Sequence, residues 1–504
     1  MIDGAQMAEG LGLLLNWHMP LVILAGMTLG LIIGVIPGMT AALGLAIVLP
    51  LTFSMDALTA LILMTSVYTG SLTGGGVLAI LINTPGTPGA VATTFDGYPM
   101  AKAGQANEAL GLQIAASAFG GAASYLVLLL FIEPMTDFAL EFQSAEMLAL
   151  VIFVLVAVGV LRGRHLLRSL FAGAVGLMLS TIGTVLTTGE PRGTLGFAEL
   201  EDGLPIVLCV IGLFAVPELI QILPRKTISE AEARIQHSLA ALWGGFKGAF
   251  RRWPTLLRGS GIGIAVGILP AAGATLASIL SYTLATRLAR AGDRFGKGEP
   301  KGVVAAESAN NASEGGAMAI LLALGIPGSA STAVILGGFM LHGLVPGTGL
   351  FRDNGPLVYG LIIGNIFQMV LLIGAALAVA YAVARIVTVP TTILVPFLTI
   401  LLSVGAFSFR GQLFDVFVVF AFGIIGWFCR RYDFTPLSLM IGLFLGSQLD
   451  QEMLRVSILY SYEPWTILER PIATTFFALT LVLIVVRIVL WVRRATTQSG
   501  EGRA

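Results

Sequence analysis

Long apolar runs constrain the fold of this chain more than any other feature of its sequence. Residues 145–161 and 474–492 each carry a single charge, and they approach the roughly 20 residues that an α-helix needs to cross a bilayer. Strands of a membrane β-barrel would instead alternate apolar and polar residues over about ten positions. The sequence therefore predicts an all-α polytopic membrane protein, embedded in a lipid bilayer by about 10–12 membrane segments.

The overall composition agrees with this fold class. Of the 504 residues, 56% are hydrophobic and 11% are charged, whereas a soluble domain is about 25% charged. The formal net charge is zero, which gives no indication of a nucleic-acid partner. The four histidines are scattered without the spacing of zinc ligands, so we expect no transition-metal site. Cys209 and Cys429 lie in apolar runs and are expected in the core rather than in a disulfide.

Basic residues cluster in five segments, which we expect on the cytoplasmic side because Lys and Arg favour that side. These segments are residues 162–168, 225–258, 287–301, 430–431 and 493–494. The acidic stretches 133–146 and 450–469 then lie outside, the N-terminus is periplasmic and the C-terminus is cytoplasmic. The apolar run between the second and third basic segments must enter and leave the membrane on one side, as a helical hairpin.

A polar stretch at residues 224–257 divides the chain. Its apolar residues in "ISEAEARIQHSLAALWGGF" recur at helical spacing, which predicts an amphipathic linker at the cytoplasmic interface. The same pattern also suits a helix that binds a partner protein.

Two blocks of sequence recur in the same order on either side of this linker. A ladder of glycines and its proline return 233 residues later: Gly26, Gly30, Gly34, Gly38 and Pro37 become Gly259, Gly263, Gly267, Ala271 and Pro270. The block "GGVLAILINTPGTPGA" resembles "GGAMAILLALGIPGSA" and pairs Pro88-Gly89 with Pro327-Gly328. The charge pattern places the loop after the first copy inside and the loop after the second copy outside. We therefore predict two inverted repeats, residues 1–223 and 258–504.

Each repeat is expected to contain a helical hairpin, then a helix broken by Pro-Gly, then spanning helices. The hairpins cover residues 18–54 and 259–286, and the broken helices cover residues 58–98 and 303–341. Proline and glycine disfavour a continuous helix, and the backbone groups they release are tolerated in a membrane only beside a cavity or ligand. Inverted repeats with matching breaks are typical of secondary transporters that bind substrate near the midplane. The predicted hairpin tips are Pro37, Gly38, Thr40, Pro270 and Gly273.

Small polar side chains gather beside both breaks. Hydroxyls, amides and helix N-termini can bind a carboxylate, and neutral oxygens can bind Na⁺, although an isolated Ser or Thr more often bonds to its own helix. The candidate substrate-binding residues are Asn83, Thr84, Pro85, Gly86, Thr87, Pro88, Gly89, Pro327, Gly328, Ser329, Ser331 and Thr332. The candidate cation-binding residues are Thr69, Ser71, Thr73, Glu307, Asn310, Asn311, Ser313 and Glu314.

The two glutamates of this set dominate the expected free-energy cost of placing the site within the membrane. Carboxylates within a membrane segment usually mark an ion or proton pathway, but Glu307 could instead reach water if its helix begins at the interface after Lys301. Few basic residues lie near either break, so a bound anion would depend on co-bound cations. We expect no cofactor other than a co-transported Na⁺ or H⁺. Asp96, in "FDGYP", is expected to cap a turn at the membrane edge.

Three stretches carry a resemblance to a known family: "GVIPGMTAALGLAIVLPLTF", "YTGSLTGGGVLAILINTPGTPGAVATTFDGYPMAKAG" and "AAESANNASEGGAMAILLALGIPGSASTAVILGGFMLHGL". They resemble the large membrane subunit of tripartite tricarboxylate transporters, the TctA family. The resemblance implies a bacterial inner-membrane permease that works with a periplasmic solute-binding protein and a small four-helix membrane subunit. It also implies uptake of di- or tricarboxylates such as citrate, driven by an ion gradient through alternating access. A homo-oligomer is left open.

Two other functions remain as alternatives. Paired re-entrant hairpins also build pores, so a passive channel for carboxylates or other anions is the closest rival. An intramembrane enzyme is less favoured, because the chain has no HExxH or GxSxG motif and few histidines for acid–base work.

Overall fold

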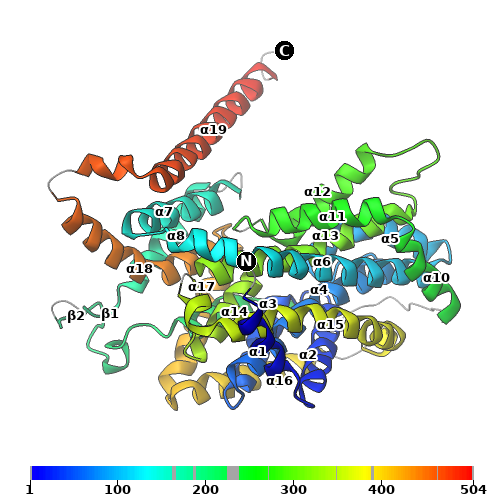
Figure 1. The fold of residues 1–504 in the computed structure, drawn as a ribbon, viewed down its shortest axis with the longest axis horizontal. Helices are drawn as coiled ribbons and strands as arrows, with labels where there is room; N and C mark the ends of the chain where they lie inside the picture. Colours follow the sequence, from blue (N-terminus) through cyan, green and yellow to red (C-terminus); the bar gives the residue numbers. More distant parts are fainter. Residues whose placement is uncertain are drawn as a thin grey trace. The chain divides into compact units, whose positions relative to one another are not determined.

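The computed structural model describes residues 3–161, 166–185, 189–223, 238–270, 272–347, 349–386, 391–461 and 464–501. These residues are mostly helical (Figure 1). The only strands among them are β1 (Gly183–Thr184) and β2 (Pro191–Arg192), which pair antiparallel. The basic segment at residues 162–165 and the first part of the predicted linker, residues 224–237, lie outside the described residues, as does Ala271.

Five helices of the described part are long and apolar enough to cross a membrane. A sixth span is formed if α1 (Gly4–Leu14) and α2 (Met19–Gly34), bent by 75°, are counted together. Shorter apolar helices add to these, so the all-α polytopic fold is confirmed. The five long helices are α4 (Ala57–Ile82), α6 (Ala106–Leu140), α15 (Leu350–Ile386), α16 (Thr391–Arg410) and α17 (Leu413–Arg431).

The chain divides into two compact units. Unit 1 comprises Met1–Asp137 and Val207–Trp427, and unit 2 comprises Phe138–Ile206 and Phe428–Ala504. Each half of the sequence therefore contributes to both units, and every candidate site residue belongs to unit 1. The two predicted repeats and their inversion stay a prediction.

Unit 2 is built from helices that precede and follow the long insertion of unit 1. They are α7 (Ser144–Leu161), α8 (Leu166–Ser180), α18 (Pro436–Leu459) and α19 (Pro471–Glu501), with the short η4 (Ala198–Leu200) and η5 (Pro464–Glu469). Helices α8 and α18 approach closely at glycines: a Cβ on Gly176 would lie 2.0 Å from the Leu439 carbonyl oxygen. Arg470 Nε pairs with the buried Glu146 carboxylate at 2.5 Å.

The first half of unit 1 contains one helical hairpin and one broken helix. The hairpin joins α2 to α3 (Ala41–Val48) and the short η1 (Leu49–Thr52) through a turn in which Gly38 has a φ of 91°. Helix α4 then has 26 residues, and after a break the chain continues as η2 (Pro88–Ala90) and the 12-residue α5 (Val91–Lys102).

The second half of unit 1 repeats this order of elements. Its hairpin consists of α11 (Trp253–Gly267) and α12 (Gly273–Arg287), where Gly273 has a φ of 62°. Helix α13 (Pro300–Leu324) has 25 residues and is followed by a break and the 12-residue α14 (Ala330–Leu341). In Figure 1 these four helices are drawn in green to yellow-green.

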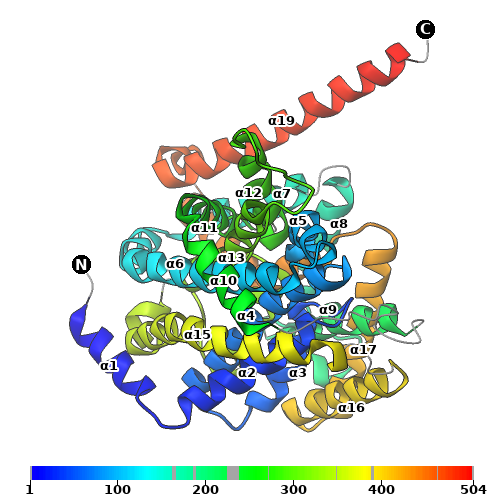
Figure 2. The ribbon, with the colours of Figure 1, turned by 90° about the vertical axis from the view of Figure 1, so that its right-hand side faces the viewer.

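Part of the predicted linker is a helix that packs against the protein. Helix α10 (Leu239–Phe250) crosses the beginning of α6 (Figure 2), where a Cβ on Gly245 would lie 2.1 Å from the Glu108 carbonyl oxygen. Helix α11 begins at Trp253, earlier than the hairpin start predicted at residue 259, because Pro254 suits the first turn of a helix.

The glycine ladders bring each hairpin onto the long helix of its own half. A Cβ on Gly34 of α2 would lie 2.3 Å from the Ser71 carbonyl oxygen of α4, and a Cβ on Gly267 of α11 would lie 2.4 Å from the Ser313 carbonyl oxygen of α13. No larger side chain fits either position without moving a backbone. The ladders therefore act as close helix contacts, as small-residue spacing predicts.

Candidate functional site

The chain reverses direction after α4, so the first break packs back against α2 and α4 instead of extending beyond the end of α4. Asn83 ends α4 in a left-handed conformation with a φ of 56°. The Gly86 N–H then donates to the Gly75 carbonyl oxygen of α4 at 3.3 Å. A Cβ on Gly86 would lie 1.9 Å from the Gly34 carbonyl oxygen. Only glycine fits this position between α2 and α4.

The second break repeats this geometry. Gly325 ends α13 in a left-handed conformation with a φ of 70°. A Cβ on Gly328 would lie 3.2 Å from the Gly267 carbonyl oxygen and 3.2 Å from the Ala317 Cβ of α13. Pro85 follows the left-handed Asn83 by as many residues as Pro327 follows the left-handed Gly325. The equivalent pairs are therefore Pro85-Gly86 and Pro327-Gly328. The sequence comparison, which paired Pro88 with Pro327, is out of register.

The long helices of the two halves run antiparallel past each other. Thr69 of α4 contacts Glu314 of α13 at 2.7 Å, and Thr73, one turn later on α4, accepts from Asn311 Nδ2 at 2.9 Å. Each break also meets the long helix of the other half. A Cβ on Gly89 would lie 2.1 Å from Asn310 Oδ1, and Ser329 lies within hydrogen-bonding reach of Tyr68 on α4.

This arrangement directs two helix N-termini toward the middle of α4 and α13. At α14, Ser329 and Thr332 form a capping box, in which the Thr332 N–H donates to Ser329 Oγ at 3.2 Å and the Ser329 N–H to Thr332 Oγ1 at 2.8 Å. These two hydroxyls therefore serve the helix start. A helix N-terminus presents unpaired N–H groups and the positive end of its dipole, which favour a nearby anion.

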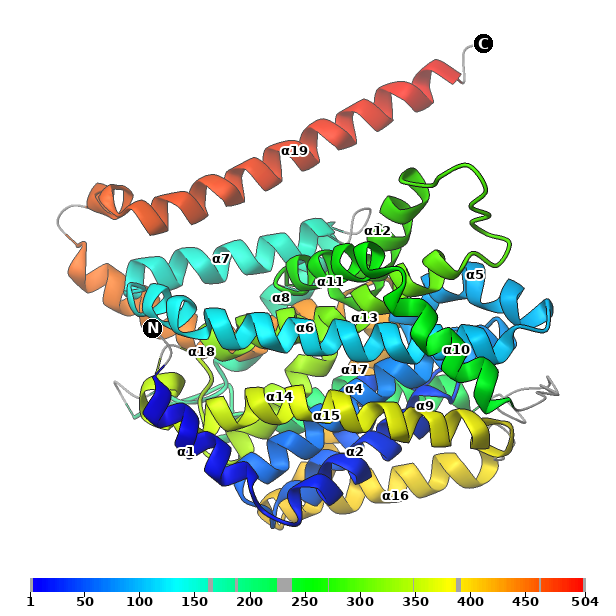
Figure 3. The same ribbon diagram turned by 45° about the vertical axis from the view of Figure 1, so that its right-hand side comes forward.

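Glu314 is fully buried and accepts hydrogen bonds from two other helices, α4 and α6, which are labelled with α13 in Figure 3. Its carboxylate accepts from Thr69 Oγ1 of α4 and from Tyr125 OH of α6 at 2.8 Å. Thr69 in turn accepts from Gln368 Nε2 of α15 at 2.9 Å. Gln368 Oε1 accepts from Ser66 Oγ at 2.7 Å. A continuous chain of hydrogen bonds thus leads from α15 through α4 to this acid.

Glu307 is also fully buried, two turns earlier on α13. It accepts from Thr93 Oγ1 of α5 and from Ser117 Oγ of α6 at 3.0 Å, and Gln113 Nε2 lies 3.4 Å away. A Cβ on Gly76 would lie 2.5 Å from Glu307 Oε1, so that glycine makes room for the carboxylate. The alternative in which Glu307 reaches water is therefore wrong.

Neither glutamate has a basic partner among the described residues. Removing an unpaired carboxylate from water costs several kcal/mol or more. Hydrogen bonds from neutral hydroxyls and amides offset only part of this cost. Each carboxyl group can be accommodated if it carries a proton or lies against a bound cation.

Four polar oxygens on α4, on α13 and at the first break are buried without a hydrogen-bond partner among the described residues. Buried polar atoms are normally paired, so each unpaired oxygen is one to which a ligand could supply the missing partner. Neutral oxygens of this kind fit a cation such as Na⁺. The oxygens are Ser71 Oγ, Thr87 Oγ1, Asn310 Oδ1 and Asn311 Oδ1.

Other predicted site residues do not reach this region as ligands. Asn83, Thr84 and Pro88 are exposed. The Thr84 hydroxyl donates to the carbonyl oxygen of Ile82, the last residue of α4, at 3.4 Å. The Ser313 hydroxyl donates to the Asn310 carbonyl oxygen at 2.7 Å. Pro85 is half-buried, whereas Pro327, Gly328 and Ser331 are buried beside the second break.

The first hairpin tip is held by a residue that the sequence did not single out. Glu218 of α9 (Ile206–Ile222) is buried and accepts from the Thr40 N–H at 3.1 Å and from the Thr40 hydroxyl at 2.7 Å. Pro37 and Pro270 are both buried. Gln113, Ser117, Tyr125 and Gln368 were missed as well, and the signal for each was an isolated polar residue in an apolar helix.

Asp96 caps the start of α13 from the other half of the chain. Its carboxylate accepts from the Gly298 N–H at 2.9 Å, the Glu299 N–H at 2.8 Å and the Tyr282 hydroxyl at 2.9 Å. Asp96 thus binds the segment that leads into α13, a helix of the second half, rather than a turn of its own segment as expected. The segment formed by η2 and α5 therefore meets α13 at Gly89 of η2, and the residues just before α13 at Asp96 of α5.

Comparison with known proteins settles the family. The model of the tripartite tricarboxylate transporter TctA family matches residues 21–441. The chain belongs to the TctA family.

Two relatives of this TctA-family chain come from Agrobacterium vitis. One, described as "Uncharacterized 52.8 kDa protein in TAR-I ttuC' 3'region", is 32% identical over 469 residues, 93% of each chain. The other, "Uncharacterized protein in TAR-II ttuC' 3'region", is 31% identical over 236 residues, which are 47% of this chain and 98% of its own. No solved structure matches. The family identifies the chain as a multi-pass membrane component of a tricarboxylate transporter.

Proposed function

We propose that this chain is the permease subunit of a secondary transporter that takes up di- or tricarboxylates such as citrate together with Na⁺ or H⁺. The observation that carries the proposal is the pair of buried acids, Glu307 and Glu314, which flank Asn310-Asn311 on α13 and have no basic partner in the described chain. Buried carboxyl groups of this kind bind and release protons or cations as their surroundings change.

The substrate is proposed to bind beside the two helix starts. The N-terminus of α14 and the backbone of Thr87 and Gly89 can offer N–H groups to a carboxylate. No Lys or Arg is among the described contacts of either break. A multivalent anion would therefore be stable there only while cations neutralise part of its charge, and this requirement couples the two solutes.

Membership of the family supports the proposed partners, and the paired breaks support the proposed transport cycle. We propose that a periplasmic solute-binding protein delivers the anion in the bacterial inner membrane, with a small four-helix membrane subunit in the complex. The N-terminus would then be periplasmic and the C-terminus cytoplasmic. Alternating access would expose the breaks to one side at a time.

Uptake into proteoliposomes tests the proposal. The complex, supplied with binding protein and radiolabelled citrate, succinate or tartrate as probes, should accumulate one of them under an inward Na⁺ or proton gradient. Glu307→Gln should remove the dependence on that gradient. Uptake that ignores both gradients would overturn coupling, and single-channel currents would favour the passive channel instead.

A further inference from the structure

A basic cavity lies between the first turns of α11 and the last turns of α12. Its volume is about 410 Å³. Five cationic side chains line it: Arg251, Arg252, Arg258, Arg290 and Lys301. All lie in segments that the charge pattern places on the cytoplasmic side.

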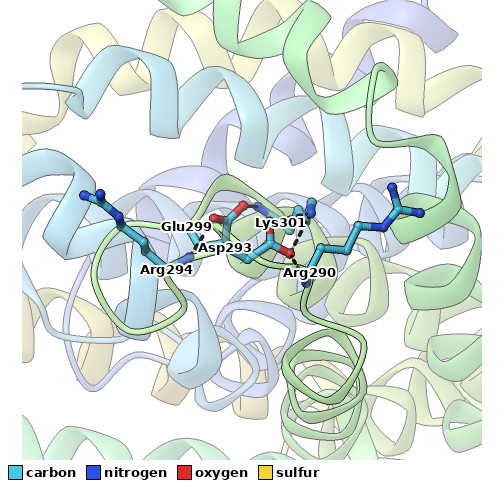
Figure 4. Close-up of polar contacts among 5 residues, drawn as sticks. All are labelled: Arg290, Asp293, Arg294, Glu299 and Lys301. Atoms are coloured by element: carbon cyan, nitrogen blue, oxygen red, sulfur yellow. Dashed lines mark hydrogen bonds and ion pairs between the residues drawn. The ribbon is translucent and has the colours of Figure 1, made fainter.

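The positive charge of this cavity is largely uncompensated. Lys301 Nζ pairs with Asp293 at 2.7 Å, whereas none of the four arginines forms an ion pair with a described residue. Figure 4 shows the Arg290 guanidinium extending away from Asp293, and the bond that Arg290 donates to this carboxylate comes from its backbone N–H, at 2.9 Å. Four guanidinium groups around one cavity favour a ligand with several negative oxygens.

The cavity is separate from the buried acids. Its floor on α13 consists of Lys301 and Ala305, which lie one turn apart on the side that meets α11 and α12. Glu307 and Glu314 point the other way, toward α4, α5 and α6. A ligand in the cavity would therefore not contact the proposed transport site.

Apart from Thr255 and Ser281, the remaining lining is apolar. Leu284, Ala285 and Leu288 of α12 form one wall. On α11, Trp253 and Leu257 are 62% and 50% exposed, as expected for side chains that face lipid. A tryptophan at this level is typical of the membrane–water interface. The cavity is thus cationic, and the surface of α11 beside it is apolar.

We propose that this cavity binds the phosphate headgroup of an anionic glycerophospholipid, whose acyl chains lie along α11 and α12. Basic pockets between membrane helices on the cytoplasmic side recognise such headgroups. A free phosphate would satisfy the arginines but would leave the apolar wall without a partner. A zwitterionic lipid would not neutralise the four guanidinium groups.

Native mass spectrometry of the full-length protein tests this site. After delipidation and exposure to cardiolipin, phosphatidylglycerol or phosphatidylcholine, the wild type should retain the two anionic lipids selectively. Arg258→Gln combined with Arg290→Gln should reduce this retention by at least about tenfold. The matched control is Arg294→Gln with Lys297→Gln, which removes the same charge from exposed residues of the neighbouring loop outside the cavity lining, and it should retain lipid as the wild type does.

The thermal unfolding temperature, measured with different ligands, distinguishes a lipid headgroup from a free anion as the ligand of the cavity. Cardiolipin should raise the unfolding temperature of the wild type and of the control, and should have little effect on the cavity variant. Equal lipid retention by both variants would overturn the proposal. So would a stabilisation of equal size by inorganic phosphate or citrate alone. Neither readout depends on transport, so this proposal can fail while the proposed function stands.

Discussion

Thr69 Oγ1 lies 2.7 and 2.8 Å from the two carboxylate oxygens of Glu314, so a helix of the first half of the chain directly holds an acid of the second half. Tyr125 supplies a further donor at 2.8 Å. None of these groups carries a positive charge. The site therefore orients the carboxyl group without fixing its charge, which leaves it able to exchange a proton or a cation.

Glu314→Gln should uncouple transport while leaving the fold intact. Glutamine keeps the size of the side chain and can still accept from Thr69 and Tyr125, but it cannot become charged. Gradient-driven uptake into proteoliposomes should fall by about 5- to 150-fold, the range of typical coupling energies. Glu9→Gln, in the exposed part of α1, is the control and should transport normally. Full gradient dependence in the Glu314 variant would contradict a coupling role.

Gly267→Ala should destabilise the contact between α11 and α13. Its Cβ would lie 2.4 Å from the Ser313 carbonyl oxygen, and such overpacking costs about 1–3 kcal/mol. The measurement is the thermal unfolding midpoint of the purified protein. Gly261 lies on the same helix, and a Cβ added there would meet no atom of another element within 4 Å. Gly261→Ala should therefore unfold at the same temperature as the wild type or higher, and equal loss in both variants would argue against close packing.

Asp96→Ala should weaken the start of α13. The change leaves the N–H groups of Gly298 and Glu299 and the Tyr282 hydroxyl without their acceptor, at a cost of about 1–2 kcal/mol for a lost cap. Hydrogen exchange at Gly298 and Glu299 should become faster. Tyr282→Phe removes only one of the three donors and should have a smaller effect. Unchanged exchange in the Asp96 variant would exclude capping.

Acid should loosen the loop between α12 and α13 through Asp293. Hydrogen bonds from the Arg290 N–H and then from Lys301 hold the pKa of this carboxyl below its ordinary value of 3.8. The folded pKa is therefore lower than the unfolded one. The stabilisation is complete above the unfolded pKa and is lost as the pH falls through the folded pKa.

Hydrogen exchange at the Arg290 amide, corrected for its intrinsic pH dependence, checks this sign. Protection in the wild type should decrease below about pH 4. Asp293→Asn should show low protection that does not change over the same range. Constant protection of the wild type down to about pH 2 would disprove the role of Asp293.

The helical breaks and the two buried acids were within reach of the sequence, because Pro-Gly pairs and carboxylates are rare in apolar segments. The sequence did not reveal which Pro-Gly pair of the first break is equivalent to the pair of the second break. The first break contains two Pro-Gly pairs and the second break only one, so two alignments were possible. The choice between the two alignments depends on the left-handed residues Asn83 and Gly325. No local sequence pattern predicted their conformation.

The residues that surround the acids were harder to predict. Gln113 and Tyr125 are isolated polar side chains in the 35-residue α6, and their importance follows only from where tertiary packing places them. Glu218 is likewise a single acid near the end of an apolar helix. Conversely, Asn83 and Thr84 adjoin a break in sequence, but the doubling back of the chain leaves them at its exposed outer edge.

The fixing of α5 to α13 limits how the protein can move. Gly89 fits against Asn310 at one end, and Asp96 holds the first turn of α13 at the other. These helices come from opposite halves of the sequence, yet neither can slide without carrying its neighbour. We therefore expect no hinge at these two contacts, and we expect a moving body that opened the site to include helices from both halves.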